Sequence, residues 1–141
     1  MKVVINVCFG GFSLSGIGEK RYLGLIGKEQ FLYKQTKYDF RDGVTEYEKT
    51  SAEGGDGMFN FTSLRDLGAK VDKWPDKEDY FYNRDIPRDD PNLVKVVEEL
   101  GNVASGSCAE LRVVEIPDGA DWEIDDYDGR EHIAECHRTW S

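Results

Sequence analysis

The sequence has few cysteines and no long apolar run, and these two absences exclude several classes of protein. Its three cysteines, Cys8, Cys108 and Cys136, are odd in number and widely spaced, which argues against the disulfide framework of a small secreted domain. No apolar stretch approaches the ~20 residues that a membrane-spanning helix needs. The apolar stretch at residues 3–5 is too short for the core of a signal peptide. We therefore expect a reduced, soluble, intracellular protein.

Basic residues are also scarce. The chain has 18 lysines and arginines against 28 acidic residues, a formal net charge of −10, and the excess of acid lies beyond residue 38. A nucleic-acid binder needs a broad basic surface to neutralise phosphates, so we expect long polyanions to be repelled. A small anionic ligand is compatible with this charge, because two or three arginines in a desolvated pocket outweigh a distant acidic surface.

Length and patterning predict one α+β domain over residues 1–141, a mainly antiparallel sheet that carries two helices. The helices are expected at residues 13–28 and 91–100. The second has the clearest ends, since Asp90 is a good N-cap, Pro91 fits the first turn and Gly101 fits the position after the last turn. Asp128-Gly129 predicts a tight hairpin. Strands are expected at about residues 2–7, 30–37, 80–82 and 109–114 and on both sides of that hairpin.

Residues 39–79 give the weakest pattern. Charged and glycine-rich stretches alternate there, and Met58-Phe59-Asn60-Phe61 is the clearest candidate strand. We expect this region to be a loop-rich elaboration on the core and the place where length variation or disorder concentrates.

The first candidate binding element is the loop between the first strand and the first helix. It consists of Phe9, Gly10, Gly11, Phe12 and Ser13. Two glycines allow a ligand to approach the backbone, free amides at a helix start favour phosphate, and the phenylalanines could stack on a base. The alternative is a tight turn whose phenylalanines enter the core. The loop lacks the lysine of a P-loop and the spacing of a dinucleotide fingerprint.

Three arginines form the second candidate set. Arg88 precedes the cap of the second helix, and Arg130 and Arg138 are the two arginines among the acidic residues after position 114. A guanidinium group matches phosphate through bidentate hydrogen bonds. The alternative is that these arginines only offset neighbouring acids.

Metal binding and catalysis receive little support. His132, Cys136 and His137, with Cys8 or Cys108, are the candidate zinc ligands, but on a strand His132 and Cys136 would lie about 13 Å apart, too far for one ion. There is no nucleophile elbow, and no acid–base pair stands out among the carboxylates. We expect no metal, no cofactor and no catalysis.

Three segments resemble a known family. They are residues 3–15, which contain Val3-Val4-Ile5-Asn6 and Cys8-Phe9-Gly10-Gly11-Phe12-Ser13-Leu14-Ser15; Ile86-Pro87-Arg88-Asp89-Asp90-Pro91 with Val96-Val97-Glu98-Glu99-Leu100-Gly101; and residues 113–140, from Val113-Val114-Glu115-Ile116-Pro117-Asp118 through Tyr127-Asp128-Gly129 to His137-Arg138-Thr139-Trp140. They are similar to small phage and prophage proteins that include the first-described Thoeris anti-defence family. The resemblance covers both ends of the chain and not residues 39–79.

The resemblance implies a protein that acts as a sponge. Proteins of that family bind and sequester the cyclised ADP-ribose signal made by bacterial TIR-domain enzymes without cleaving it, in the cytoplasm of the infected bacterial host. It also implies a separate site for cyclic oligonucleotides and assembly as a dimer or larger oligomer. The site residues above follow from their chemistry and not from the resemblance.

Binding energetics independently favour a homodimer or larger oligomer. A useful sponge needs roughly nanomolar affinity, near −12 kcal/mol. Two arginine–phosphate contacts of about 1.5–3 kcal/mol each and one stacked base of about 1–3 kcal/mol fall short once association costs are subtracted. A second subunit that closes over the ligand would supply the rest, and Trp140, next to the chain end, suggests docking there. Two alternatives stay open: a small phage nucleotide hydrolase or phosphodiesterase, and an acidic inhibitor that binds a protein.

Overall fold

Strand pairing is antiparallel throughout the computed structural model, which describes residues 1–41, 43–51, 60–72, 75 and 78–135. The predicted α+β fold with two α-helices is confirmed. The elements, in chain order, are β1 (Lys2–Asn6), α1 (Gly16–Leu25), β2 (Phe31–Asp39), β3 (Gly43–Lys49), β4 (Asn60–Ser63), β5 (Lys70–Val71), β6 (Tyr80–Phe81), the 3-10 helix η1 (Asn83–Asp85), α2 (Pro91–Leu100), the 3-10 helix η2 (Gly101–Ala104), β7 (Leu111–Glu115), β8 (Trp122–Tyr127) and β9 (Arg130–Glu135).

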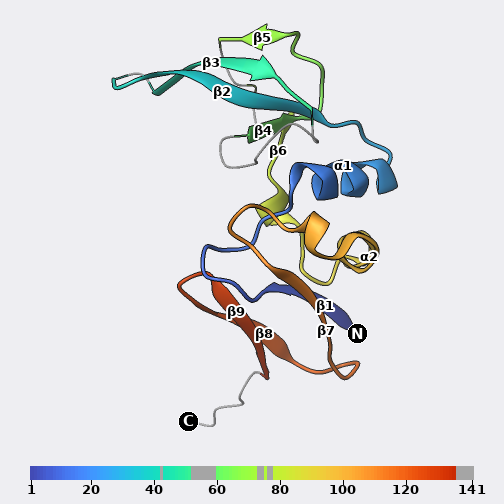
Figure 1. Cartoon of the computed structure of the whole chain (residues 1–141). Helices are drawn as coiled ribbons and strands as arrows, with labels where there is room; N and C mark the ends of the chain where they lie inside the picture. The colour runs from blue at the N-terminus through green and yellow to red at the C-terminus, as the bar shows by residue number, and fades with distance from the viewer. Residues whose placement is uncertain (42, 52–59, 73–74, 76–77, 136–141) are drawn as a thin grey trace.

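The molecule has two halves (Figure 1). A five-stranded sheet in the order β5-β3-β2-β4-β6 forms the sheet half, residues 31–81. Residues 1–30 and 82–135 form the helix half, in which α1 and α2 lie between that sheet and the pairs β1–β7 and β8–β9. The chain therefore leaves the helix half once, builds the sheet half as one continuous stretch, and returns.

The main core lies in the helix half. Strand β1 pairs with β7 from Lys2↔Glu115 to Asn6↔Leu111, and α2 packs against this pair while α1 packs against α2 and η2. Helix α2 places Leu93, Val94, Val96 and Val97 on its buried face, as its apolar spacing predicts. No helix in the described part of the chain is long and apolar enough to cross a membrane.

The predicted helix ends are close to those observed. Helix α2 begins after Asp90, whose carboxylate accepts from the backbone N–H groups of Asn92 and Leu93, and Gly101 caps its end. Helix α1 is shorter than predicted. It starts after Ser15, whose hydroxyl accepts from the N–H of Gly18, and it ends at Leu25 before the glycine at position 27.

The region 39–79 contains more strand than the sequence pattern indicates. Strands β3, β4 and β5 lie in it, and β3 pairs with β2 along most of its length. The pattern gave no sign of β3, in which Glu46, Glu48 and Lys49 are interspersed with Val44 and Tyr47. The predicted strand at Met58-Phe59-Asn60-Phe61 is observed from Asn60 onward, and its first two residues lie outside the described residues.

The hairpin β8–β9 is attached to the helix half at its tight turn. Asp128 and Gly129 have φ values of 53° and 89°, as the predicted two-residue turn requires. The fully buried Asn6 donates from Nδ2 to the carbonyl of Gly129 at 2.7 Å, and its backbone N–H donates to the carboxylate of Glu131 at 2.8 Å. These bonds hold the turn against the end of β1.

Candidate ligand-binding cleft

A cleft of about 630 Å³ opens where the two halves meet. Five segments line it: the loop before α1 from position 10 onward, the first turn of α1, strand β4, the stretch from β6 into η1, and the loop at residues 105–108. Small-molecule sites commonly have volumes of about 300–1,000 Å³ and lie between structural units. The size and position of this cleft are those of a ligand site.

One wall of the cleft is built from two loops of small residues packed together. The backbone N–H of Gly106 donates to the carbonyl of Ser13 at 2.9 Å, and that of Ser15 donates to Ala104 at 2.8 Å. Gly10 has a φ of 130°, and a Cβ there would lie 2.6 Å from the carbonyl oxygen of Cys108. Only glycine allows this approach, which brings the serine-containing loops into the same wall.

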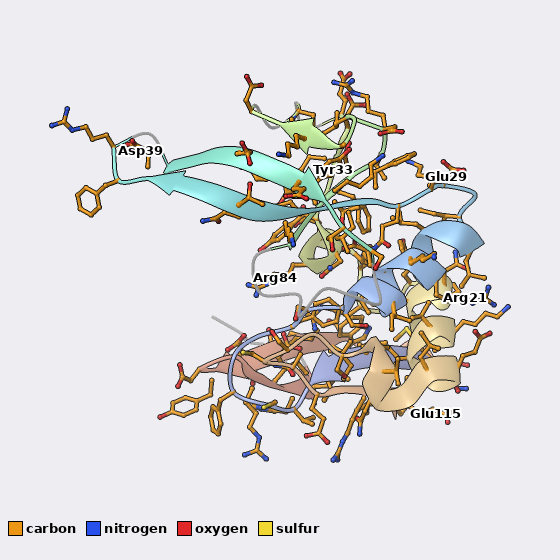
Figure 2. The ribbon with its side chains drawn as sticks, turned by 45° about the horizontal axis from the view of Figure 1, so that its top comes forward. Arg21, Glu29, Tyr33, Asp39, Arg84 and Glu115 are labelled. Atoms are coloured by element: carbon orange, nitrogen blue, oxygen red, sulfur yellow. The ribbon has the colours of Figure 1, made fainter. Side chains whose placement is uncertain are left out.

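The facing wall is aromatic and carries a cation. Tyr80 and Tyr82 are stacked, with ring centroids 6.2 Å apart and planes at 19°. Tyr82 is 43% exposed, and the exposed Arg84 follows two residues later. Figure 2 shows Arg84 between the two halves, directed away from the helices. Exposed aromatic rings are stacking platforms for bases, and a guanidinium group binds phosphate.

Glu19 is a buried carboxyl group in the lining of this cleft. It is 5% exposed. Its Oε1 accepts from the hydroxyl of Thr62 and from Nε2 of Gln30 at 3.0 Å, and its Oε2 accepts from Nδ2 of Asn83 at 2.7 Å. Burial raises the pKa of Glu19 above its ordinary value, although these three hydrogen bonds act in the opposite direction. One side chain of α1 thus contacts β4 and both stretches of chain that join the two halves.

The raised pKa of Glu19 gives a prediction for stability against pH. A carboxyl whose pKa is higher in the folded than in the unfolded state stabilises the fold below its ordinary value of 4.5 and loses this contribution as pH rises through the folded pKa. We expect the stability of the wild type relative to Glu19→Gln to fall as pH rises from about 4.5.

Urea unfolding of both proteins at several pH values measures this difference. The pKa values of Asp66, Glu99 and Asp118 are lowered, so the contributions of these groups to stability change at lower pH. Both proteins contain these groups, so their contributions cancel in the difference. A difference that stays constant or increases with pH would contradict the burial effect.

The structure places the predicted loop residues in different surroundings. Gly10 and Ser13 line the cleft, whereas Gly11 faces the turn of the β8–β9 hairpin. Phe12 is 3% exposed and belongs to the core, which fits the alternative that this loop is a tight turn whose phenylalanines enter the core. Phe9 is 54% exposed and lies outside the lining.

The two predicted arginines that the structure describes, Arg88 and Arg130, lie outside the cleft lining. Arg88 forms two hydrogen bonds to the carboxylate of Glu131, at 2.5 and 2.9 Å, and lies 3.7 Å over the ring of Phe12. This partner fits the charge-balancing alternative for Arg88. Arg130 lies 5.9 Å over the exposed ring of Phe9. Arg138 lies outside the described residues, as do Cys136 and His137 of the zinc candidates.

The sequence pattern does not single out Glu19, Asn83, Arg84 or the loop at residues 105–108. Glu19 gave no signal, because one glutamate among 28 acidic residues shows its burial only once the fold is known. The triplet Ser105-Gly106-Ser107 resembles any polar turn. Among the described residues, no group of three or more His, Cys, Asp or Glu is placed to hold a metal ion. No family model, curated protein or solved structure matches the chain.

Proposed function

We propose that this protein binds a small nucleotide of the cyclic ADP-ribose type in the cleft and retains it without cleaving it. The observation that carries the proposal is the composition of the two walls. Stacked tyrosines and Arg84 face serine and glycine loops across a space of about 630 Å³. A base on the exposed ring of Tyr82 and a pyrophosphate against Arg84 and the serines at positions 13 and 107 would use both walls. The hydroxyl of Ser15 already donates to the carbonyl of Val103, and that of Ser105 accepts from the N–H of Leu111.

The ligand class and the biological role come from the family resemblance of the two chain ends. In this role the protein is a phage anti-defence protein in the cytoplasm of an infected bacterium, and it blocks Thoeris immunity by withdrawing the signal. The charge of −10 supports a small ligand over a long nucleic acid, and the energetic requirement for an enclosed ligand supports a homodimer or larger oligomer. The described lining holds a single carboxyl group, Glu19, and no histidine, which supports binding over acid–base hydrolysis.

Release of ligand by heat tests the proposal against its alternatives. The protein is incubated with cyclic ADP-ribose, passed through a desalting column and denatured, and the released nucleotide is identified by chromatography. We expect intact nucleotide in a fixed ratio to protein. An altered nucleotide would indicate a hydrolase or phosphodiesterase, and absence of nucleotide would favour an inhibitor that binds a protein.

The Arg84→Ala variant tests the placement of the ligand. Loss of a charge-assisted hydrogen bond of about 1.5–3 kcal/mol should weaken binding by roughly 10- to 150-fold, with the fold intact. Arg21→Ala is the matched control, because Arg21 is exposed on α1, pairs with Glu99 at 3.1 Å and lies outside the lining. Calorimetric titration measures both variants.

The same titration with Arg130→Ala and Arg138→Ala tests the original hypothesis for these arginines. Weakened binding in these variants, with wild-type affinity for Arg84→Ala, would place the ligand outside the cleft.

A further inference from the structure

A two-stranded arm projects from the sheet half. Strand β4 pairs with β2 as far as Lys34, and β5 pairs with β3 at Tyr47 and Glu48. Within the described part of the chain, residues 36–46, here called the arm, therefore pair only with one another. At about 3.4 Å per residue, β2 continues about 17 Å beyond its last pair with β4. Figure 2 shows Asp39 at the far end of the arm, away from the helices.

The tip of the arm presents an aromatic ring and a cation to solvent. Phe40 is 95% exposed, more than any other large apolar side chain that the structure describes. Arg41 follows it, is also exposed, and forms no ion pair with a described residue. The turn itself is held by Asp39, whose carboxylate accepts from the N–H of Arg41 at 2.7 Å. A hairpin with both edges free is marginally stable, so a partner at the tip would also stabilise the arm.

A groove of about 420 Å³ lies beside the loop between β7 and β8, at the opposite end of the molecule from the arm (Figure 1). Two exposed carboxylates, Asp118 and Asp121, belong to its lining, and Asp121 forms no ion pair with a described residue. An apolar groove with carboxylates beside it fits an aromatic side chain that is followed by a cation. The apolar lining consists of Ile116, Pro117, Ala120, Trp122, Ile133 and Ala134.

Backbone hydrogen bonds hold the groove in shape. The N–H of Ala120 donates to the carbonyl of Pro117 at 3.2 Å, and the N–H of Ile116 donates to that of Met1 at 2.8 Å. The other wall is the paired hairpin β8–β9, in which Trp122 and Ile133 lie on the two strands. A preformed groove costs little ordering when it binds a partner.

We propose that this groove receives the tip of the arm from a second copy of the chain. Phe40 of one copy packs against Trp122 and its apolar neighbours in the other, and Arg41 faces Asp121. The arm and the groove lie too far apart for one molecule to fill its own groove (Figure 1). Two copies that exchange arms about a twofold axis would make the contact twice.

The charge of the chain favours a second copy as the occupant. A net charge of −10 opposes the association of identical chains, so an interface between copies needs a place where a cation meets carboxylates. The tip of the arm and the groove supply the two sides of such a contact. The inference gives a surface to the homo-oligomer of the proposed function, and both parts lie outside the lining of the cleft.

Sedimentation velocity over a series of protein concentrations tests the inference. We expect the wild type to associate and Phe40→Ala to weaken the association at least tenfold, because each contact loses a buried phenylalanine side chain. Tyr127→Ala is the matched control and should associate as the wild type does. Tyr127 is 77% exposed beside the turn of the other hairpin and lies outside the groove lining.

An exchange of charges tests whether the tip enters this groove. Arg41→Asp and Asp121→Arg should each weaken the association about tenfold or more, because each places like charges opposite one another. The double variant Arg41→Asp with Asp121→Arg restores opposite charges and should recover most of the wild-type association. All three positions, 40, 41 and 121, are exposed, so we expect the fold to stay intact.

Each outcome bears on a stated part of the proposal. Wild-type association in Phe40→Ala would overturn the inference and leave the proposed ligand binding standing, because release of nucleotide by heat tests the cleft separately. A double variant that recovers nothing would also overturn it, since Arg41 would then not face Asp121. Loss of association in Asp121→Arg alone would give the groove a different occupant and contradict the inference. A monomeric wild type would overturn the inference together with the homo-oligomer of the proposed function.

Discussion

Replacing Arg88 by alanine is expected to lower the free energy of unfolding by about 3–5 kcal/mol, because it leaves a buried carboxylate without its cation. Glu131 is 7% exposed and accepts two hydrogen bonds from the guanidinium group of Arg88. Alanine also removes the cation from the face of Phe12. The loss acts where the hairpin β8–β9 meets the end of β1, since Glu131 also accepts from the N–H of Asn6.

Urea unfolding of Arg88→Ala and of Arg21→Ala measures this effect. The Arg21–Glu99 pair is exposed on the surface, and its loss should cost less than about 1 kcal/mol. Equal stability losses in the two variants would show that the Arg88–Glu131 pair is no stronger than a surface pair. The double variant Arg88→Met with Glu131→Leu should recover only part of the loss, because it leaves no buried charge but removes the acceptor of the buried N–H of Asn6.

Replacing Gly129 by alanine is the second change with a large expected effect. A Cβ at this position would lie 2.6 Å from the backbone nitrogen of Gly10 and closer still to that of Gly11. Backbone atoms cannot rotate away as a flexible side chain does, so the hairpin must move off the loop. We expect a loss of about 1–3 kcal/mol from overpacking, in addition to about 1 kcal/mol for an alanine at a positive φ.

Gly119→Ala separates these two contributions. Gly119 has a φ of 77°, similar to the 89° of Gly129, but a Cβ there would meet nothing within 4 Å. This control should therefore lose only the conformational part, about 1 kcal/mol. Thermal unfolding of both variants decides the matter, and equal losses would mean that the hairpin turn is not packed against the glycine loop in solution. Because Gly10 also lines the cleft, ligand affinity should fall in Gly129→Ala and not in Gly119→Ala.

The elements that the sequence predicts well are those whose signals are local. Helix α2 has a cap, a proline, an apolar face and a terminal glycine within a dozen residues, and its observed bounds are the predicted ones. The turn at Asp128-Gly129 depends on two adjacent residues. Strand β3 has no comparable signal, because its position is decided by pairing with β2.

The candidate site is harder to predict, because its groups come from distant parts of the chain. Glu19 binds Thr62 and Asn83, which are 43 and 64 residues away. The two interpretations of Arg88, ligand contact and charge balance, differ only in its partner, and that partner lies 43 residues further on. Gly10 is an exception, because the sequence predicts that another group approaches its backbone closely. In the structure, the backbone of Cys108 makes such an approach.

The construction of the two halves has a consequence for the order of folding. Strand β1 pairs with β7 across more than a hundred residues, so this contact carries a large loop-closure cost while the chain between them is unfolded. The strands of the sheet half are separated by short sequence distances and can pair first. Gln30 and Asn83, next to the two ends of the sheet half, both donate to Glu19 of α1. Formation of the sheet half therefore brings the chain back to α1 and shortens the loop that must close when β1 pairs with β7. We expect the sheet half to assemble early and the pairing of β1 with β7 to be the slow step.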